Sequence, residues 1–351
     1  MAAEWKFLIA ALAAFGLMAL ILVVPKGNEP IATPTSTTPI VASVPAFDHI
    51  YLIVMENEEK RSVVGNPNAP YLNQLIDDYG IATNYTAVAH PSQPNYVALW
   101  SGSTQGVRDD GVRRIEATNV ADQLEANGKS WMVFAENVPV ASARGEPICY
   151  TGATASGGPD GGGTYARKHE PAISFLDVST DRSRCISHIT NFSHFSPAAA
   201  NLELIVPNLC HDMHDCGLQA GDAWLQNWLP SHLLNTSTWR NTNSALFITW
   251  DEGSTNAGGG GQVATIVVSK ETPPGFTSHV PHNHYSLLRT LQAAWTLGCL
   301  KQTCEANSLG EFFSRQTATR GSPNAVTSAE LSQNALESTV RPTWRSRESP
   351  H

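Results

Sequence analysis

The chain has 351 residues, of which 42% are hydrophobic and 15% are charged, and its formal net charge is −9. This length suits one large α/β domain with extensions and is too short for two such domains with both ends disordered. Arg108, Arg113 and Arg114 form the only local basic group, so the sequence argues against a nucleic-acid partner.

An apolar segment begins the chain. Positions 7–24 carry no charge, and their number approaches the ~20 residues that a helix needs to cross a bilayer. We interpret residues 1–26 as a signal peptide or membrane anchor, and we favour the anchor because no small-residue cleavage site follows directly. Residues 27–46 are rich in Pro, Thr and Ser and predict an extended linker. We therefore expect an extracytoplasmic protein, membrane-anchored or secreted.

Polar residues with ligand oxygens follow two short apolar runs, at 50–55 and 245–250. Such runs predict buried strands of a parallel sheet, and ligands of open α/β sheets bind beyond the carboxyl ends of the strands. Oxygen ligands gathered there suit a divalent cation, either Ca²⁺, Mg²⁺, Mn²⁺ or Fe. The four candidate ligands are Glu56, Asn57, Asp251 and Glu252.

A serine lies between a strand-like run at 81–88 and an apolar stretch at 96–100. Ser92 belongs to the motif His-Pro-Ser-Gln-Pro-Asn-Tyr, and we predict an N-cap-like position for it. Backbone N–H groups and the helix dipole favour an anion at such a position. Beside a metal, the hydroxyl could act as a nucleophile. Taken alone, the pattern favours an ordinary N-cap serine.

The remaining runs complete an α/β fold. Strands alternating with helical segments predict a mostly parallel central sheet with helices on both faces. The polar stretch 316–351 predicts a disordered tail, which leaves 47–315 for the folded domain, and we expect a monomer. Further strands are predicted at 131–134, 202–206 and 263–268, and helices at 119–127 and 286–297.

Six cysteines indicate an oxidising compartment. An even count outside any Cys-x-x-Cys arrangement suits disulfides in an exported protein. The sequence leaves the connectivity open. The segment 211–215 contains two histidines that could instead bind zinc, but their spacing matches no closed structural zinc pattern. Cys210 and Cys216 bracket the segment 211–215, Cys299 and Cys304 are five residues apart, and Cys149 and Cys185 remain as the third pair.

Several short motifs occur in order along the chain: Glu56-Asn57, the segment 65–72, the serine motif 90–96, Ser-Gly-Ser at 101–103, 165–169, 207–215, 249–253 and 284–290. Together they resemble the phosphoesterase family that contains bacterial secreted acid phosphatases and phospholipases C. The resemblance is greatest to the compact secreted acid phosphatases, some of which act on phosphoinositides. It implies an architecture similar to that of the alkaline phosphatase superfamily, where a metal-bound Ser or Thr attacks phosphorus.

The resemblance also implies roles for the matching residues. Ser92 would be the nucleophile, and His169 and His214 would lie around the phosphate as catalytic groups. Cationic and donor groups suit a phosphate ester, and histidine can protonate a leaving alkoxide. The implied metal ligands are Glu56, Asn57, Asp251 and Glu252, and the implied substrate contacts are Asn57, Asn95, Lys168 and His284.

Three functions remain open. The first is a metal-dependent acid phosphatase that hydrolyses phosphate monoesters through a phosphoserine at Ser92. The second is a phospholipase C-type phosphodiesterase, or a phosphoinositide phosphatase. The third, a non-catalytic membrane-tethered binding protein, is disfavoured because the full set of catalytic residue types is present. A serine esterase of the Gly-x-Ser-x-Gly kind is disfavoured because prolines lie on both sides of Ser92.

Overall fold

The computed structural model describes residues 43–142, 145–157 and 162–313. The predicted segments 1–26 and 316–351 lie outside these residues, as does most of the linker 27–46, so these boundaries stay predictions. Among the described helices, none combines the length and the apolar character that crossing a bilayer requires.

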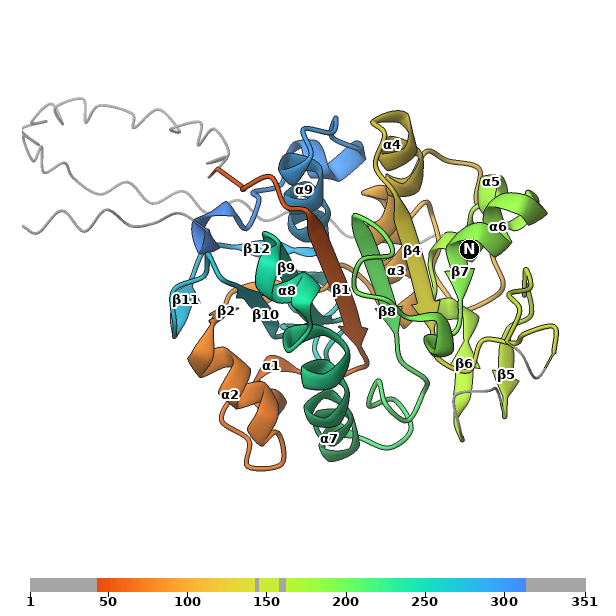
Figure 1. The fold of residues 1–351 in the computed structure, drawn as a ribbon. Coiled ribbons are helices and arrows are strands. Elements are labelled where there is room, and N and C mark those ends of the chain that lie inside the picture. Colours follow the sequence, from red (N-terminus) through yellow and green to blue (C-terminus); the bar gives the residue numbers. More distant parts are fainter. Residues whose placement is uncertain (1–42, 143–144, 158–161, 314–351) are drawn as a thin grey trace, which may run out of the picture. The chain divides into compact units, whose positions relative to one another are not determined.

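An eight-stranded sheet forms the centre of the described domain (Figure 1). Its strands are β1 (His49–Met55), β2 (Gly80–Ala82), β4 (Trp131–Ala135), β7 (Ile189–Thr190), β8 (Leu202–Val206), β9 (Ser244–Trp250), β10 (Thr265–Ser269) and β11 (Phe276–Ser278). The spatial order is β11-β2-β10-β9-β1-β8-β4-β7. Only β10 runs antiparallel to its neighbours in this sheet of the described residues. The predicted mostly parallel α/β sheet is confirmed.

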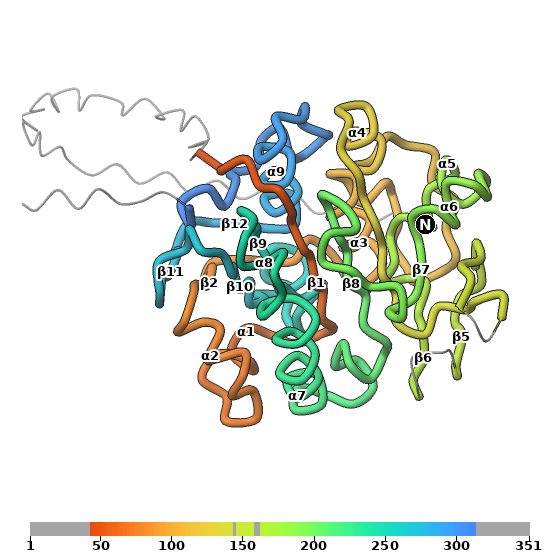
Figure 2. Tube along the Cα trace, in the orientation of Figure 1, coloured from red at the N-terminus to blue at the C-terminus, as the bar shows by residue number. Residues whose placement is uncertain are grey.

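Strand β1 occupies the middle of the sheet, with β9 on one side and β8 on the other, both parallel to it. All residues of β8 and β9 and six of the seven in β1 are buried, because helices cover both faces and leave no solvated face. This burial explains why the three strands are mostly apolar in the sequence, with Glu203 as the charged exception. Figure 2 traces the chain into β1 at the centre of the domain.

The helices form two layers around the sheet (Figure 1). α2 packs on α7, while α3 packs on α4 and α9 on the opposite face. Two small two-stranded sheets, β3 (Tyr85–Thr86) with β12 (His282–Asn283) and β5 (Thr154–Ser156) with β6 (Thr164–Ala166), lie outside the main one. The helices are α1 (Lys60–Val63), α2 (Pro70–Asp78), α3 (Ser92–Ser101), α4 (Val120–Ala126), α5 (Leu176–Ser179), α6 (Arg182–His188), α7 (Leu218–Leu229), α8 (Ser237–Asn241) and α9 (His284–Ala294).

The predicted strand at 81–88 is wrong as a single element. The chain leaves the main sheet after β2 and pairs again only in β3, which belongs to a different sheet. The break lies at Thr83, whose carbonyl accepts hydrogen bonds from the side chains of Lys60 and Gln262 (2.6 and 3.0 Å). The helix predicted at 286–297 begins two residues earlier, where Asn283 caps it through its side chain.

Three disulfides join the cysteines in the three groups that the sequence suggests. Cys149 bonds Cys185, Cys210 bonds Cys216, and Cys299 bonds Cys304. The predicted disulfides are therefore confirmed, and the structure supplies the connectivity that the sequence left open. One of them closes the loop that follows β8.

A buried carboxylate holds the loop that follows β9. Glu59 accepts hydrogen bonds from the backbone N–H groups of Ser254, Thr255 and Gln262 at 2.8, 3.2 and 3.0 Å. Burial acts to raise the pKa of Glu59, but these hydrogen bonds outweigh it and hold the pKa below its ordinary value. The same loop packs closely on its neighbour, since a Cβ on Gly259 would lie 2.6 Å from the carbonyl oxygen of Val88.

Candidate active site

Two of the predicted metal ligands end neighbouring strands. β1 and β9 are parallel with Met55 opposite Trp250, so Glu56 and Asp251 follow at the same level. The backbone N–H of Asp251 donates to the carbonyl of Met55 at 3.0 Å. Both carboxyl groups are buried, at 1% and 0% exposure. The sheet register alone therefore brings together two acidic side chains that are 195 residues apart in sequence.

The loop after β8 adds a third carboxyl group. Asp212 lies in the loop closed by the disulfide between Cys210 and Cys216, and its carbonyl accepts a hydrogen bond from the N–H of Glu56 at 2.7 Å. Its side chain is also buried. Because β8 is parallel to β1, its loop emerges at the same edge of the sheet as Glu56.

Ser92 is the first residue of α3 rather than its N-cap, which is Pro91. The N-cap prediction is therefore wrong, and the hydroxyl makes no capping hydrogen bond. It donates instead to Glu56 Oε2 at 3.1 Å. One turn along α3, the hydroxyl of Tyr96 donates to Glu56 Oε1 at 2.5 Å. The start of α3 thus presents two hydroxyl groups to a single carboxylate.

Asn95 fixes the turn that precedes the serine. Its Oδ1 accepts the backbone N–H groups of Val88 and Ala89, both at 3.0 Å, and its Nδ2 donates to the carbonyl of Ala89 at 2.8 Å. The side chain is fully buried. Asn95, a predicted substrate contact, thus uses its side chain to hold the backbone that precedes Ser92.

His169 lies between two of the carboxyl groups. Its Nδ1 is 3.0 Å from Asp212 Oδ2, and its Nε2 is 3.0 Å from Glu56 Oε1, while the ring stacks on Tyr96 at 5.2 Å between centroids. Burial, with the nearby charge of Lys168, lowers the pKa of His169 well below its ordinary value. A neutral ring carries only one N–H, so His169 can donate to only one of the two carboxyl groups.

His214 lies at the open side of this group. Its ring centroid is 5.9 Å from that of His169, and its Nδ1 is 2.7 Å from Asp215 Oδ1. Its backbone N–H donates to Asp212 Oδ1 at 2.9 Å. With about a third of its side chain exposed, His214 is the more accessible of the two predicted catalytic histidines.

Burial raises the pKa of the clustered carboxyl groups, and their mutual repulsion adds to it. Glu56 is raised well above its ordinary pKa by burial and then by Asp251 and Asp212. Asp251 is raised by burial and then by Glu252. Burial also raises the pKa of Asp212 to about 7. Lys168 acts to lower the pKa of Glu56 and Asp212, but burial outweighs this attraction.

Glu252 and Asn57 lie beside that pair. Asn57 Nδ2 donates to Glu252 Oε1 at 2.8 Å, and its backbone N–H donates to Asp251 Oδ1 at 3.3 Å. The other Glu252 oxygen is 2.5 Å from His90 Nδ1. All four predicted metal-binding residues therefore lie at the ends of β1 and β9, and hydrogen bonds join Asn57 to Asp251 and to Glu252.

Lys168 provides the nearest positive charge. Its Nζ donates to Asp110 Oδ2 at 3.2 Å, and Asp110 Oδ1 accepts the backbone N–H of Gln93 at 3.0 Å. Burial acts to lower the pKa of Lys168, but attraction to Glu56 and Asp110 raises it overall. The ammonium group is thus linked through Asp110 to the residue that follows Ser92.

His284, a predicted substrate contact, lies beneath the carboxyl groups. Its Nε2 is 2.5 Å from the carbonyl oxygen of Asp251, and its Nδ1 is 3.1 Å from the hydroxyl of Tyr85. The side chain is fully buried, and burial lowers its pKa to about 4. Both ring nitrogens therefore contact protein groups, and His284 helps to hold the backbone at Asp251.

The donor set has the chemistry that a hard divalent cation requires. It consists of carboxylate and amide oxygens, and Asp251 Oδ2 is buried without a hydrogen-bond partner. In the residues that the structure describes, no group of three or more His, Cys, Asp or Glu side chains stands in the arrangement of a metal centre. The charge and the unpaired oxygen therefore fit a cation.

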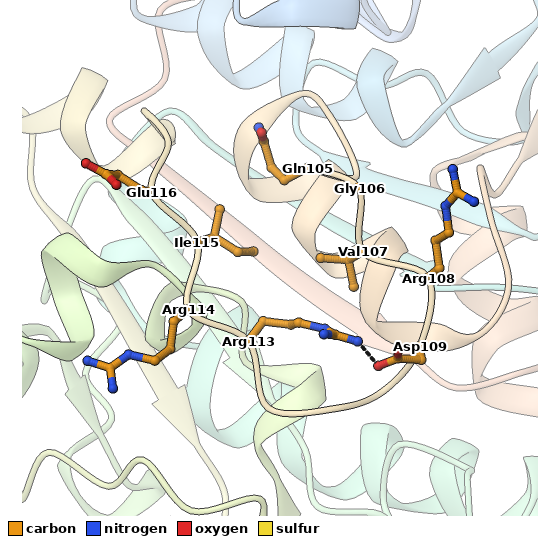
Figure 3. Close-up of a pocket in the computed structure, with 9 residues that line it drawn as sticks. All are labelled: Gln105, Gly106, Val107, Arg108, Asp109, Arg113, Arg114, Ile115 and Glu116. Atoms are coloured by element: carbon orange, nitrogen blue, oxygen red, sulfur yellow. Dashed lines mark hydrogen bonds and ion pairs between the residues drawn. The ribbon is translucent and has the colours of Figure 1, made fainter.

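A larger cavity lies to one side of this group. It has a volume of about 510 Å³ and is lined by the loop of residues 105–109 and 113–116. Figure 3 shows Arg113 extending across it to Asp109, with which it forms an ion pair. Neither Ser92 nor the clustered carboxyl groups line it. Residues 110–112 of the same loop line a smaller cavity next to Lys168.

Sequence reasoning did not identify four residues that the structure places in the site. Asp212 lies within the segment that Cys210 and Cys216 bracket, but the sequence pattern there pointed to the histidines. Tyr96 and His90 belong to the serine motif, whose pattern could have suggested them. No sequence signal marked Asp110, because it approaches Lys168 only through the fold.

Comparison with known proteins finds one matching family and several similar proteins. The pattern described as the Phosphoesterase family matches residues 56–298. The phosphatidylinositol-3-phosphatase of Mycobacterium tuberculosis is 31% identical over 259 residues, which are 73% of this chain and 79% of that protein. An acid phosphatase of Aspergillus fumigatus is 29% identical over 75% of this chain, and a phosphate-repressible acid phosphatase of Penicillium chrysogenum is 30% identical over 75%. The chain spans 58% and 63% of these two fungal proteins.

Solved structures show a weaker likeness. A phosphonate monoester hydrolase from Silicibacter pomeroyi superimposes with a TM-score of 0.49 at 11% identity, covering 76% of each chain. A putative sulfatase from Bacteroides thetaiotaomicron gives a TM-score of 0.48 at 14% identity, covering 76% of this chain and 74% of that one. A likeness at this level carries no argument about the site.

Proposed function

Because this chain belongs to the Phosphoesterase family and is a hydrolase of phosphoric esters, we propose that it is a metal-dependent acid phosphatase acting on phosphate monoesters through Ser92. The observation that supports the serine is its hydroxyl, buried at the start of α3 and bonded to Glu56 at 3.1 Å. The alternative of a non-catalytic binding protein is wrong, since the family assignment makes the chain an enzyme.

The proposed reaction has two steps. Ser92 Oγ attacks phosphorus while its proton passes to Glu56, the carboxylate to which it already donates. The bond from phosphorus to the alcohol oxygen breaks, and that oxygen takes a proton. Water then attacks the phosphoserine, releasing inorganic phosphate and returning a proton to Ser92 Oγ. Both steps conserve atoms and require no oxidant or reductant.

Neighbouring groups bind the phosphate and move the proton. Lys168 supplies positive charge beside the first turn of α3, whose N–H groups also favour an anion. His214, partly exposed next to His169, is the proposed proton donor to the leaving alcohol. The proton between His169 Nδ1 and Asp212 Oδ2 would stay within this buried pair during the reaction.

Glu56, Asn57, Asp251 and Glu252 would hold the divalent cation. Its charge would favour the ionised serine and offset the negative charge that builds on the phosphoryl oxygens. The support for this proposal is the crowding of buried carboxyl groups around Asp251, with one oxygen unpaired. The metal could be Ca²⁺, Mg²⁺, Mn²⁺ or Fe, all of which accept oxygen ligands.

A phosphoinositide is the second candidate substrate. It is favoured by the mycobacterial phosphatidylinositol-3-phosphatase, which this chain matches over 79% of that protein's length. A phosphodiesterase of the phospholipase C type remains the runner-up reaction. Phosphate release from phosphatidylinositol 3-phosphate in mixed micelles, compared with release of phosphoinositol from a diester, separates the two.

The three disulfides indicate that the domain works outside the cytoplasm. We infer that residues 1–26 direct export and that they tether the domain to a membrane through the linker 27–46. Cell fractionation of the full chain and of a chain starting at Ala46 checks this inference. If expression of the full chain yields protein only in the culture fluid, cleaved between residues 25 and 45, the domain is secreted and not tethered.

Trapping of the intermediate tests the mechanism. Purified protein is mixed with a phosphomonoester and a divalent cation, quenched in acid within the first turnovers, and analysed by peptide mass spectrometry. The mass of one phosphoryl group is expected on the peptide that contains Ser92. Turnover without any phosphopeptide, together with an active Ser92→Ala variant, would exclude the covalent route.

A further inference from the structure

A cavity of about 120 Å³ lies beside the proposed nucleophile. Two of its lining residues, Gln93 and Lys168, are the chain neighbours of Ser92 and His169. Val112 and Leu209 contribute apolar walls. The position of this cavity suits the part of a substrate that is attached to the phosphate.

One residue that lines the cavity, Gln93, has an unpaired hydrogen-bond acceptor. Gln93 is 1% exposed, and its side-chain Oε1 is buried with no hydrogen-bond partner. Its backbone N–H is already bonded to Asp110, so the amide group is the part of this residue that is left for a ligand. A buried amide oxygen without a partner is unfavourable, and a ligand that donates to it would be stabilised.

A second lining residue, Arg167, has unpaired donors. Arg167 is 2% exposed, and its Nη2 donates to the carbonyls of Arg113 and Ile173 at 2.9 and 2.7 Å. Its Nε and Nη1 have no partner. Burial lowers the pKa of Arg167, although the negative charge of Glu170 acts to raise it. Arg167 therefore contributes donor groups whose charge is partly offset.

A hydroxyl group meets both needs, because it donates one hydrogen bond and accepts others. We propose that this cavity binds the alcohol part of the substrate and that Gln93 and Arg167 recognise its hydroxyl groups, so that the enzyme prefers polyol monoesters. Lys168 is already paired with Asp110, which favours a neutral polyol over a second anionic group.

The size of the cavity agrees with this substrate class. At a share of about 30 Å³ per water molecule, it holds the equivalent of about four waters, enough for a three-carbon polyol or one edge of a cyclitol ring. The apolar walls at Val112 and Leu209 suit the carbon skeleton. This inference rests on the proposed phosphomonoesterase activity and adds the substrate class to it.

Two substrates with the same carbon skeleton test the inference. Glycerol 2-phosphate and isopropyl phosphate differ only by two hydroxyl groups, and the ratio of their kcat/KM values reports hydroxyl recognition. For the wild type we expect a ratio of roughly ten or more, since a site built around hydroxyl groups rejects analogues that lack them. In Gln93→Leu we expect the ratio to fall by about three- to tenfold, the loss of one neutral hydrogen bond.

Two further variants guard against misfolding at a buried position. Gln74→Leu makes the same chemical change at an exposed site on α2 and should keep the wild-type ratio. Ala153→Phe replaces an exposed lining residue and should narrow the cavity. It should therefore lower the kcat/KM of glycerol 2-phosphate relative to methyl phosphate, the smallest ester.

The outcomes separate the two proposals. A wild-type ratio of glycerol 2-phosphate to isopropyl phosphate near one, or the same ratio in Gln93→Leu as in the wild type, overturns the polyol cavity while the phosphatase proposal stands. The cavity is also overturned if Ala153→Phe keeps the wild-type ratio of glycerol 2-phosphate to methyl phosphate. A wild type that hydrolyses none of the three monoesters with any divalent cation overturns both proposals. The inference is supported if the first ratio falls in Gln93→Leu and stays in Gln74→Leu, and the second ratio falls in Ala153→Phe.

Discussion

Ser92 Oγ lies 3.1 Å from Glu56 Oε2, which joins the first residue of α3 to the end of the central strand β1. Replacing the serine with alanine removes the proposed nucleophile but leaves the helix start in place. We expect Ser92→Ala to lower kcat on the order of 10³-fold or more with little change in melting temperature. Ser237→Ala, at the exposed first residue of α8, is the matched control. Activity of the Ser92 variant within about tenfold of wild type would contradict the assignment.

Removal of one clustered carboxyl group should have opposite effects on metal binding and on metal-free stability. In Asp251→Asn we expect less bound divalent cation and lower activity, because a proposed ligand is lost. In chelator-treated protein the same change should raise stability by about 1–2 kcal/mol, since Asp251 is buried and repelled by Glu252. Elemental analysis and thermal unfolding with and without chelator measure both effects. Stoichiometric metal in Asp251→Asn and also in Glu56→Gln would refute the shared site.

Glu203 should make the fold less stable as pH rises. This residue of β8 is fully buried with Oε2 unpaired, and burial raises its pKa to about 8 from 4.5. Below pH 4.5 both states hold the proton; between pH 4.5 and 8 only the folded state does, so stability falls over that window. At pH 8, Glu203→Gln should be more stable than wild type by on the order of 3–5 kcal/mol.

The measurement for Glu203 is denaturant unfolding across that pH range. The advantage of Glu203→Gln should shrink toward pH 4.5. Glu305→Gln, an exposed position, controls for the loss of a charge and should follow the wild-type curve. A Glu203→Gln curve parallel to that of the wild type would show that Glu203 is ionised in the folded protein.

The Cys210–Cys216 disulfide should matter for activity as well as for stability. It closes the loop that carries Asp212 and His214, whereas the Cys299–Cys304 bond closes a loop of similar length elsewhere. Each double Cys→Ser change should lower stability by about 2 kcal/mol in the chain-entropy picture. Only the first should also reduce kcat/KM, by roughly tenfold, because it frees residues beside His169. Equal kinetics for the two variants would mean that the disulfide has no part in the site.

The sequence predicts the central strands well because they are buried on both faces. The runs at 50–55, 202–206 and 245–250 are mostly apolar, with Glu203 and Thr249 as exceptions, and all three are strands of the sheet. The acidic residues that follow two of them meet at one edge because the strands are parallel neighbours. The meeting of Glu56 and Asp251 could thus be inferred from chain order and strand type, whereas the roles of the other site residues came from the family resemblance.

Side-chain partners that depend on loops were not predictable in this way. The sequence indicated an N-cap serine, but Pro91 takes that position and leaves the Ser92 hydroxyl for Glu56. His284 matched a substrate position, yet it is buried below Asp251. Asp212 was overlooked because its contact with His169 depends on how the disulfide-closed loop folds. These contacts are set by tertiary packing, which periodicity and motif spacing do not encode.

The carboxylate of Glu59 fixes the segment 254–262, and this limits which loops can vary to change the range of substrates. Three backbone N–H groups bond to it, and Gly259 packs against Val88, so the segment 254–262 tolerates little remodelling. Across the site, the loop 105–116 borders one cavity with one set of residues and a second cavity with another. Exchange of the loop 105–116 between relatives would therefore change the preference for one ester over another while leaving the catalytic residues in place. Exchange of the segment 254–262 would instead shift the backbone that positions Asp251.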